Sequence, residues 1–268
     1  MRLIIKFSKN TTPMSAVNQH LVNSYIYCKC LKNDRQTHDK KNDYCISSLY
    51  GGVLNAEDKT VDFPNGAFIA ITSNNQNLLN SIIEGVLNNP DFYNGMKHNG
   101  FDFVSETFFN GWNHFATLSP FIIRKFLDKK SYSFYVIEDK SFLQKANDKT
   151  LQKIIPLNDV DFSKMITEHT ISKIKAVSPN ADLKDFKIEV KSHNSHKIKV
   201  IKKQYDHETE RCVINYANQC QISVYCNKSV AEIIYTIGIG QSTGCGFGTI
   251  YKTENHKKYK FELIGLKK

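Results

Sequence analysis

Long apolar runs are missing from this sequence of 268 residues. No stretch approaches the roughly 18 consecutive apolar residues of a membrane-spanning helix, and residues 1–7 reach Lys6 too soon for a secretory signal. The seven cysteines are an odd number without a Cys-x-x-Cys pair, which argues against a disulfide framework and against paired zinc ligands. We therefore expect a cytoplasmic protein with reduced cysteines, no membrane partner and no metal.

Nucleotide-binding signatures are missing too, although glycine is locally dense. Five of the 13 glycines lie from Gly238 to Gly248, where the backbone can take positive φ angles and approach a ligand closely. No Gly-Lys-Ser/Thr follows Gly244, so this is not a Walker A loop, and the 20 residues after Gly248 are too few to complete a dinucleotide-binding unit. The loop therefore predicts either phosphate contacts through its backbone N–H groups or an ordinary turn, and no cofactor.

The composition is that of a folded protein with a basic balance. Hydrophobic residues make up 41% of the chain and aromatic residues 12%, which is enough for a sizeable core. Lys and Arg total 36 against 26 Asp and Glu, giving a net charge of +10. This balance favours a polyanionic partner without identifying one.

Hydrophobic spacing in the first half alternates between the strand period and the helix period. It predicts, in chain order, a strand at 1–7, a helix from 14 to about 31, strands at 44–49 and 67–72, a helix at 77–87 and a strand at 101–108. This β-α-β-β-α-β order is the ferredoxin-like arrangement, in which two helices cover one face of an antiparallel sheet.

The second half repeats this order more loosely. It predicts a strand at 114–119, a mostly helical segment at 150–177, strands at 186–190, 197–202 and 212–225, a helix at 228–237 and a strand at 248–251. We therefore expect an α+β protein of tandem ferredoxin-like (RRM-like) domains, residues 1–112 and 113–268, with the glycine-rich loop in the second domain.

Four short stretches occur in an order that matches one known family. They are a helix over 18–27 that ends in Ile-Tyr, Thr37-His38 before the strand Tyr-Cys-Ile-Ser at 44–47, Phe-Ala-Thr-Leu-Ser-Pro at 115–120, and the loop 238–248 that ends in Gly-Phe-Gly. Together they resemble the CRISPR-associated endoribonuclease that cuts precursor CRISPR RNA within each repeat, a family of the repeat-associated superfamily built from ferredoxin-like folds. The resemblance covers nearly the whole chain.

The resemblance implies a metal-independent cleavage in which the 2′-OH of the RNA attacks the adjacent phosphate, giving a 2′,3′-cyclic phosphate and a 5′-OH. Tyr27, His38 and Lys41 match the family's catalytic residues, with Lys40 as an alternative lysine because the interval after His38 is short. The chemistry suits these residue types, since imidazole titrates nearest pH 7 and a lysine stabilises developing negative charge. His20, on the first helix, is a second candidate histidine.

RNA contacts are expected from the loop and from a basic strand. Residues 246–251 resemble the RNA-recognition signature, in which glycine and aromatic residues share a strand. The strand at 197–202 belongs to a stretch with no acidic residue between 191 and 203, which otherwise marks a solvated face. The expected RNA-binding residues are Lys40, Lys197, Lys199, Lys202, Gly238, Gly240, Gln241, Ser242, Thr243, Gly244, Gly246 and Gly248.

Two alternatives concern a metal and the absence of catalysis. His193 and His196 suggest metal ligands, but the hairpin turn expected around them has no third ligand, so we expect no metal there. The chain could instead be a non-catalytic repeat-RNA-binding subunit of a CRISPR effector complex, which would bind without cutting. CRISPR repeat RNA is the expected partner in either case, with effector-complex subunits as further candidates, for a chain that acts as a monomer or a homodimer.

Overall fold

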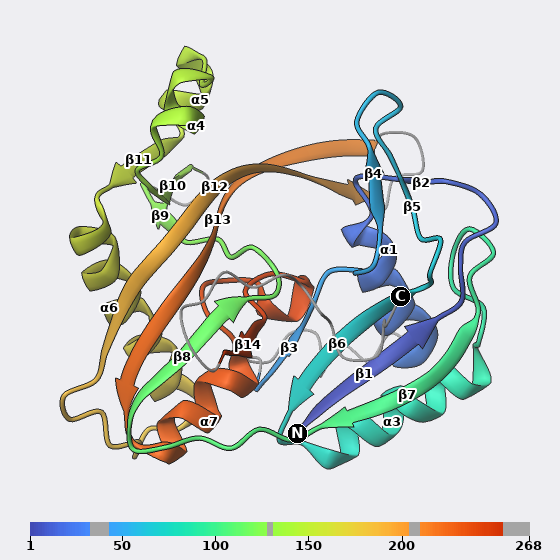
Figure 1. Cartoon of the computed structure of the whole chain (residues 1–268), viewed down its shortest axis with the longest axis horizontal. Helices are drawn as coiled ribbons and strands as arrows, with labels where there is room; N and C mark the ends of the chain where they lie inside the picture. Colours follow the sequence, from blue (N-terminus) through green and yellow to red (C-terminus); the bar gives the residue numbers. More distant parts are fainter. Residues whose placement is uncertain (33–42, 128–130, 204–209, 254–268) are drawn as a thin grey trace.

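The computed structural model describes residues 1–32, 43–127, 131–203 and 210–253, with only the backbone described at 194–203 and 210–213. It holds two four-stranded sheets, the first on the right of Figure 1 and the second on the left. No helix in the described ranges is long and apolar enough to cross a membrane.

The first sheet has the strand order of a ferredoxin-like unit. From one edge to the other its antiparallel strands are β3 (Tyr44–Ile46), β6 (Ala67–Ser73), β1 (Arg2–Phe7) and β7 (His98–Val104). Its helical elements are α1 (Gln19–Asn23), the π-helix η1 (Ser24–Cys30) that continues it, and α3 (Gln76–Asn88). Ile26 and Ile82 from these helices share one core with the alternate strand residues Leu3 and Ile5. The expected β-α-β-β-α-β order is confirmed.

The first helix begins later than the hydrophobic spacing predicts. Met14 lies in the short strand β2 (Met14–Ser15), which pairs with β5 (Thr60–Asp62), and β5 pairs in turn with β4 (Val53–Asn55). Met14 is 1% exposed because its side chain packs in the core of the first unit, together with Phe63. Its apolar character therefore reflects a place in the same core, reached from a strand and not from the helix.

The second sheet repeats the same order with elements from the second half of the chain. Its strands are β12 (Lys187–Lys203), β13 (Glu210–Cys226), β8 (Gly111–Thr117) and β14 (Ile250–Lys252). The helices α6 (Asp159–Val177) and α7 (Lys228–Ile237) contribute Phe162 and Ile234 to a core shared with Phe115 and Ile222. The chain is thus two ferredoxin-like units in tandem. Their division after residue 112 stays a prediction.

One strand of another three-stranded sheet interrupts the segment 150–177, which was expected to be mostly helical. This sheet lies outside the two four-stranded ones. It consists of β9 (Arg124–Phe126), β10 (Tyr132–Ile137) and β11 (Ile154–Leu157), with α4 (Lys140–Gln144) and α5 (Asp148–Leu151) between β10 and β11. Pro156 has no backbone N–H and cannot continue a helix interior, so β11 separates α5 from α6. The longer helix then starts at Asp159 and is capped by Asn158, whose side chain accepts a hydrogen bond from the Asp161 backbone N–H.

β12 and β13 form one long hairpin of two 17-residue strands. The turn expected at 193–196 is wrong, because His193 pairs with Cys220 and His196 with Ala217 inside the ladder. The far part of the hairpin crosses to the side of the molecule that carries α1, and β12 contacts that helix (Figure 1). The hairpin therefore extends well beyond the sheet that it belongs to.

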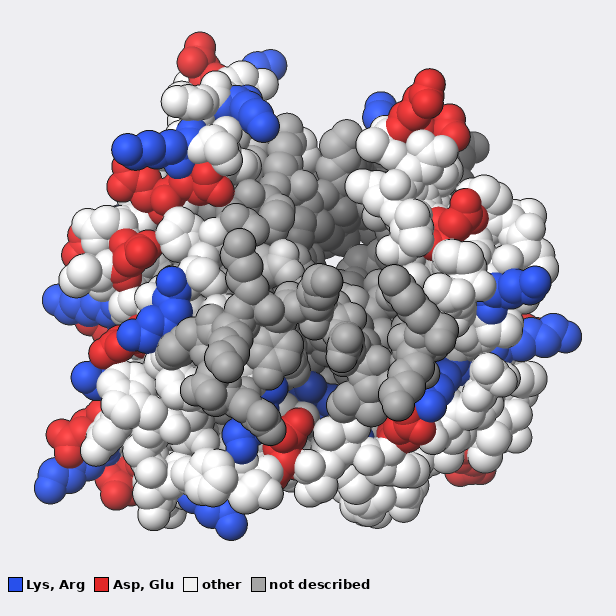
Figure 2. All heavy atoms as spheres, in the orientation of Figure 1, with Lys and Arg blue, Asp and Glu red and all other residues white. Residues whose placement is uncertain are grey.

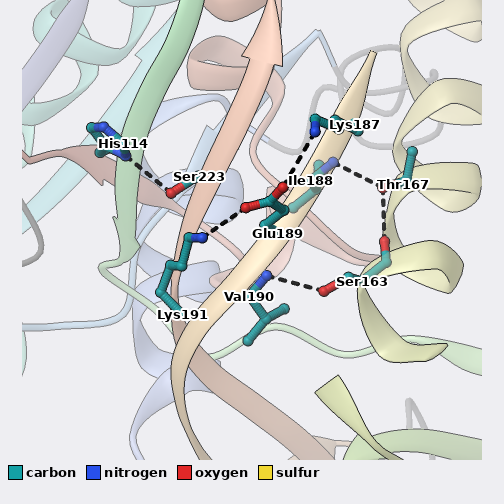
Figure 3. A network of polar contacts seen from close by, with 9 residues as sticks. All are labelled: His114, Ser163, Thr167, Lys187, Ile188, Glu189, Val190, Lys191 and Ser223. Atoms are coloured by element: carbon teal, nitrogen blue, oxygen red, sulfur yellow. Dashed lines mark hydrogen bonds and ion pairs between the residues drawn. The ribbon is translucent and has the colours of Figure 1, made fainter. Parts of the chain in front are cut away.

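The outer edge of β12 is covered by hydroxyl groups from α6 (Figure 3). The backbone N–H of Ile188 donates to Thr167 Oγ1 at 2.9 Å, and that of Val190 donates to Ser163 Oγ at 3.0 Å. An edge strand with free N–H groups invites pairing with another chain. These two side chains satisfy the edge and fix α6 along the sheet.

Arg2 joins the two units and is 4% exposed. Its Nε donates to Thr72 Oγ1 at 2.8 Å, and an Nη donates to the carbonyl oxygen of Ile250 in β14. Its guanidinium also lies 4.2 Å from the centre of the Tyr235 ring on α7. The second unit therefore covers this face of the first sheet, which is why all seven residues of β6 are buried.

We predict that Arg2→Met lowers the free energy of unfolding by about 2–4 kcal/mol, because each buried acceptor left without a donor costs about 1–3 kcal/mol. Lys6→Met is the matched control on the same strand. Lys6 pairs with Asp102 at 2.6 Å, but both side chains are about a third exposed (37% and 35%), so its loss should cost less than about 1 kcal/mol. Urea unfolding measures both, and equal losses would contradict the role given to Arg2.

Candidate functional site

The glycine-rich loop, from Gly238 to Gly248, connects α7 to β14 and is mostly buried. Four of its glycines have positive φ angles between 67° and 90°, a region that glycine adopts without steric cost. Within the loop only Gln241, Ser242 and Cys245 are partly exposed. The loop is therefore largely interior, which differs from the open phosphate-binding turn that glycine density alone suggested.

Donors from the first unit bind three consecutive carbonyl groups of the loop, those of residues 244–246. Tyr27 Oη on η1 donates to the first at 2.7 Å, Asn23 Nδ2 on α1 to the second at 3.4 Å, and Ser48 Oγ to the third at 3.2 Å. These bonds join the helix of the first domain to the loop of the second. Tyr27 thus lies beside the loop.

A lysine from α6 binds the loop from the opposite side. Lys173 Nζ lies 2.7 Å from the carbonyl oxygen of Ile237 and 3.2 Å from those of Gly238 and Gly240, and it lies 3.1 Å from Thr243 Oγ1. Its three N–H donors thus have four oxygen atoms within reach. Burial lowers the pKa of Lys173 to about 7, whereas the carbonyl oxygens favour its protonated form.

The Tyr27 hydroxyl also meets a second tyrosine. Its oxygen lies 2.5 Å from the hydroxyl oxygen of Tyr44 at the start of β3, and the two side chains are 8% and 3% exposed. Burial raises the pKa of Tyr44 to about 12 and that of Tyr27 further still. Both phenols therefore stay protonated at neutral pH, so Tyr27 acts here as a hydrogen-bond donor and not as a base.

Two of the loop glycines lie in close contact with other parts of the protein, Gly248 with backbone and Gly246 with a side chain. A Cβ atom on Gly248 would lie 1.8 Å from the carbonyl oxygen of Ile239, and one on Gly246 would lie 1.8 Å from the side-chain nitrogen of Gln19. The glycine density therefore has a packing cause that needs no ligand. Contacts of the loop with RNA stay a prediction.

The remaining predicted site residues fall into three groups. His38, Lys40 and Lys41 lie outside the described residues. Lys197, Lys199 and Lys202 lie in β12, where the described backbone pairs them with Tyr216, Ile214 and Arg211. His20 follows Gln19 on α1, the helix that leads to Tyr27.

The described residues gather no group of three or more His, Cys, Asp or Glu side chains that could hold a metal ion. His193 pairs instead with the first turn of α6, where its Nε2 lies 3.0 Å from Asp159 Oδ1.

Residues 105–251, more than half of the chain, match a family model described as CRISPR associated protein Cas6, C-terminal. The chain belongs to the Cas6 family. Three solved structures each align with 95% of this chain. A Cas6-related protein from Pyrococcus furiosus is 17% identical over 98% of its own chain, with a TM-score of 0.69. An RAMP protein binding different RNA substrates is 17% identical over 100% of its chain (TM-score 0.70), and a CRISPR associated protein Cas6 is 16% identical over 99% of its chain (TM-score 0.67). At these identities the likeness shows the shared tandem fold. No curated protein matches the sequence.

Sequence reasoning missed Lys173 and Tyr44 in this Cas6 chain. The helical spacing places Lys173 next to the buried face of α6, because it lies three residues after Thr170 and seven after Ile166, which are both buried. Tyr44 was expected only as part of a strand. Nothing in the local sequence indicates that its hydroxyl meets that of Tyr27.

Gly248→Ala should destabilise the protein far more than Gly100→Ala, the matched control. Both glycines have positive φ angles (68° and 117°), but a Cβ at Gly100 meets nothing within 4 Å. The control measures only the cost of placing an alanine at a positive φ angle, about 1–3 kcal/mol. Gly248→Ala adds to this the clash between the new Cβ atom and the Ile239 carbonyl oxygen. Thermal unfolding of both variants checks this, and similar melting temperatures would contradict the close contact.

Lys173→Met should lower the free energy of unfolding by about 1–3 kcal/mol, because it removes the donor from two loop carbonyls, the last carbonyl of α7 and a loop hydroxyl. Lys175→Met is the control, since Lys175 is exposed and lies two residues further along the same helix. This substitution should change the free energy of unfolding by no more than about 0.5 kcal/mol. Hydrogen exchange of the loop amides provides a local readout. Unchanged exchange in Lys173→Met would show that the lysine does not hold the loop.

Proposed function

We propose that this Cas6 chain is a metal-independent endoribonuclease that cleaves precursor CRISPR RNA within the repeat. The 2′-oxygen attacks the adjacent phosphorus, forming the O2′–P bond while the P–O5′ bond breaks. The proton of the 2′-OH passes to a base, and an acid protonates the leaving 5′-oxygen. The products are a 2′,3′-cyclic phosphate and a 5′-OH, and the reaction consumes no co-reactant.

The observation that carries this proposal is the hydrogen bond from Tyr27 to the Gly244 carbonyl. The tyrosine and the glycine-rich loop are two features of the family resemblance, and they come from opposite ends of the chain. Tyr27 also meets Tyr44 at the start of β3, so these three segments lie together. Such clustering of matched motifs from distant segments supports a common site.

The remaining roles follow the resemblance. His38 is proposed as the acid–base group, because an unperturbed imidazole titrates near pH 6.5 and exchanges protons at neutral pH. Lys41, or Lys40, would stabilise the charge that develops on the phosphorane. Tyr27, as a protonated donor, would orient the loop or the RNA, and His20 is the second candidate for the histidine role.

RNA binding is supported by an aromatic pair on the open face of the second sheet. Trp112 on β8 and Tyr225 on β13 pair across the strands, lie 5.4 Å apart between ring centres and are 39% and 37% exposed. Lys187 Nζ lies 4.7 Å from the Trp112 ring. Exposed rings beside a cation are suited to stacking RNA bases and to contacting phosphate.

Basic side chains do not form a single patch on the face shown in Figure 2, where the described Lys and Arg residues alternate with Asp and Glu around the periphery. We therefore assign phosphate contacts to local groups. These are the β12 lysines Lys197, Lys199 and Lys202 and the partly exposed loop residues Gln241 and Ser242.

The second candidate function is a repeat-RNA-binding subunit that does not cut, acting with effector-complex subunits. The burial of Tyr27 favours it, because a side chain that is 8% exposed, with its hydroxyl bonded to two protein groups, can be purely structural. Both candidates use the same repeat RNA, so an assay of cleavage separates them.

The test is incubation of the purified protein with labelled repeat RNA from the source genome in excess EDTA, beside the same RNA with a 2′-deoxy substitution at the scissile position. We expect a single cut that survives EDTA and vanishes with the deoxy substitution. Binding without a cut would favour the second candidate, and a cut abolished by EDTA would overturn the proposed mechanism.

His38→Ala should slow single-turnover cleavage by roughly 10²–10⁴-fold, because it removes the proposed proton-transfer group. The dissociation constant for repeat RNA should stay nearly unchanged. His20→Ala is the companion variant. If it slows cleavage while His38→Ala does not, the histidine role belongs to α1 instead.

A further inference from the structure

The hairpin of β9 and β10 carries an exposed aromatic ring at the edge of its three-stranded sheet. Phe126 on the edge strand β9 is 65% exposed, so most of its ring is open to solvent. It pairs across the hairpin with Tyr132, whose ring centre lies 6.1 Å from its own. Phe126 therefore packs against a second ring while most of its surface stays accessible to a ligand.

Two cations lie beside this ring. Arg124 is on the same face of β9 as Phe126, and its guanidinium lies 5.2 Å from the centre of the Tyr132 ring. Lys125, between them in the chain, is exposed. Among the residues that the structure describes, neither Arg124 nor Lys125 forms an ion pair with an acidic side chain. Arg124, Lys125 and Phe126 together form the β9 surface.

The charge of the β9 surface favours RNA over a protein partner. From residue 124 to residue 137 the sequence has four Lys and Arg residues and one acidic residue, Asp128. A protein that covered this surface would have to supply acidic side chains to two buried cations, whereas RNA supplies a phosphate with every nucleotide. RNA also supplies bases, which stack on exposed aromatic rings. An open ring beside unpaired cations is therefore suited to single-stranded RNA.

The hairpin begins at the glycine-rich loop. The backbone N–H of Gln241 donates to the carbonyl oxygen of Ile122 at 2.8 Å, and the backbone N–H of Arg124 donates to Gln241 Oε1 at 3.2 Å. Phe126 follows Ile122 by four residues, which span at most about 14 Å of extended chain. A base on Phe126 would therefore belong to a nucleotide close to any RNA bound at the loop.

The same hairpin lies beside the long hairpin of β12 and β13 (Figure 1). Arg124 donates from Nη2 to Asn215 Oδ1 on β13 at 3.2 Å. In the ladder of the long hairpin, Asn215 pairs with Ile198, and Tyr216 pairs with Lys197. The β9 surface therefore lies next to the part of β12 where the sequence predicts RNA contacts.

We propose that the β9 surface binds one unpaired nucleotide of the RNA, with the base stacked on Phe126 and the adjoining phosphates next to Arg124 and Lys125. This inference rests on the proposed function and adds a contact outside the junction of the two units. It is separate from the pair of Trp112 and Tyr225, because Tyr225 lies ten residues beyond Asn215 on β13, about 33 Å along a strand. The two sites therefore bind different nucleotides.

The test compares three variants by their dissociation constants for labelled repeat RNA. Phe126→Leu should weaken binding by about tenfold, because it removes the stacking face. Phe126→Trp should keep the affinity of the wild type, because it retains an aromatic face. Leu127→Ala is the matched control, since Leu127 is the next residue and is 61% exposed but offers no ring, and it should leave binding unchanged. Melting temperatures show whether each variant folds.

Abasic substitutions identify the nucleotide that the ring contacts. Single abasic sites are placed at each position of the repeat RNA. With the wild type, we expect one unpaired position where loss of the base weakens binding about as much as Phe126→Leu does. In Phe126→Leu this penalty should vanish, while the penalties at other positions remain. Lys125→Met should lower the slope of log Kd against log salt by about 0.7, the value for one phosphate contact on a single strand.

Two results would overturn the proposal while the proposed function stands. A folded Phe126→Leu that binds RNA as tightly as the wild type would show that no base stacks there, and would leave a protein partner as the occupant of the ring. Equal losses in Phe126→Leu and Phe126→Trp would contradict stacking, which needs only an aromatic face. Failure of the wild type to bind repeat RNA would overturn both proposals.

Discussion

The carbonyl groups of the glycine-rich loop are the constraint on which the arrangement of this protein depends. Donors from the first unit take the carbonyls of residues 244–246, while Lys173 from the second unit takes those nearer to α7. A buried carbonyl that loses its donor is costly, so neither unit can shift without breaking these bonds. The position of Tyr27, the course of the loop and the packing of the two sheets are therefore fixed together. Any reaction at this junction would therefore take place between groups whose positions are fixed by these hydrogen bonds.

The same junction explains why neither face of the first sheet is exposed to solvent along β6. Its inner face packs on α3 and η1, and its outer face meets α7 and β14 of the second unit. The Arg2 side chain lies between the two units. Its charged guanidinium contacts the Thr72 hydroxyl, the Ile250 backbone carbonyl and the Tyr235 ring. A ferredoxin-like sheet usually leaves one face for a ligand or a partner. Here part of that face is used to build the tandem.

Much of the fold could be predicted from the sequence, because hydrophobic spacing reports local burial. The helix at 228–237 ends where expected, since Gly238 follows its last apolar residue. The prediction of a mostly helical segment at 150–177 was wrong in its first part, because Pro156 and the Asn158 cap separate a strand from the later helix. The oxygen partners of Lys173 lay beyond local reasoning, because they follow it by 64 to 70 residues. The site could be foreseen only as far as motifs from distant segments matched one family.

The contact between Arg2 and Ile250 spans 248 positions of the chain, and this has a consequence for synthesis on the ribosome. At about 5–20 residues per second, roughly 10–50 s pass between emergence of the first strand and emergence of the carbonyl that receives its arginine. Until then the nascent first sheet carries an uncovered face, and Tyr27 has no loop to bind. A chain truncated before residue 244 lacks the backbone oxygen that Tyr27 binds. The junction therefore forms only after the chain has been extended past Ile250, whose carbonyl oxygen receives the Arg2 side chain.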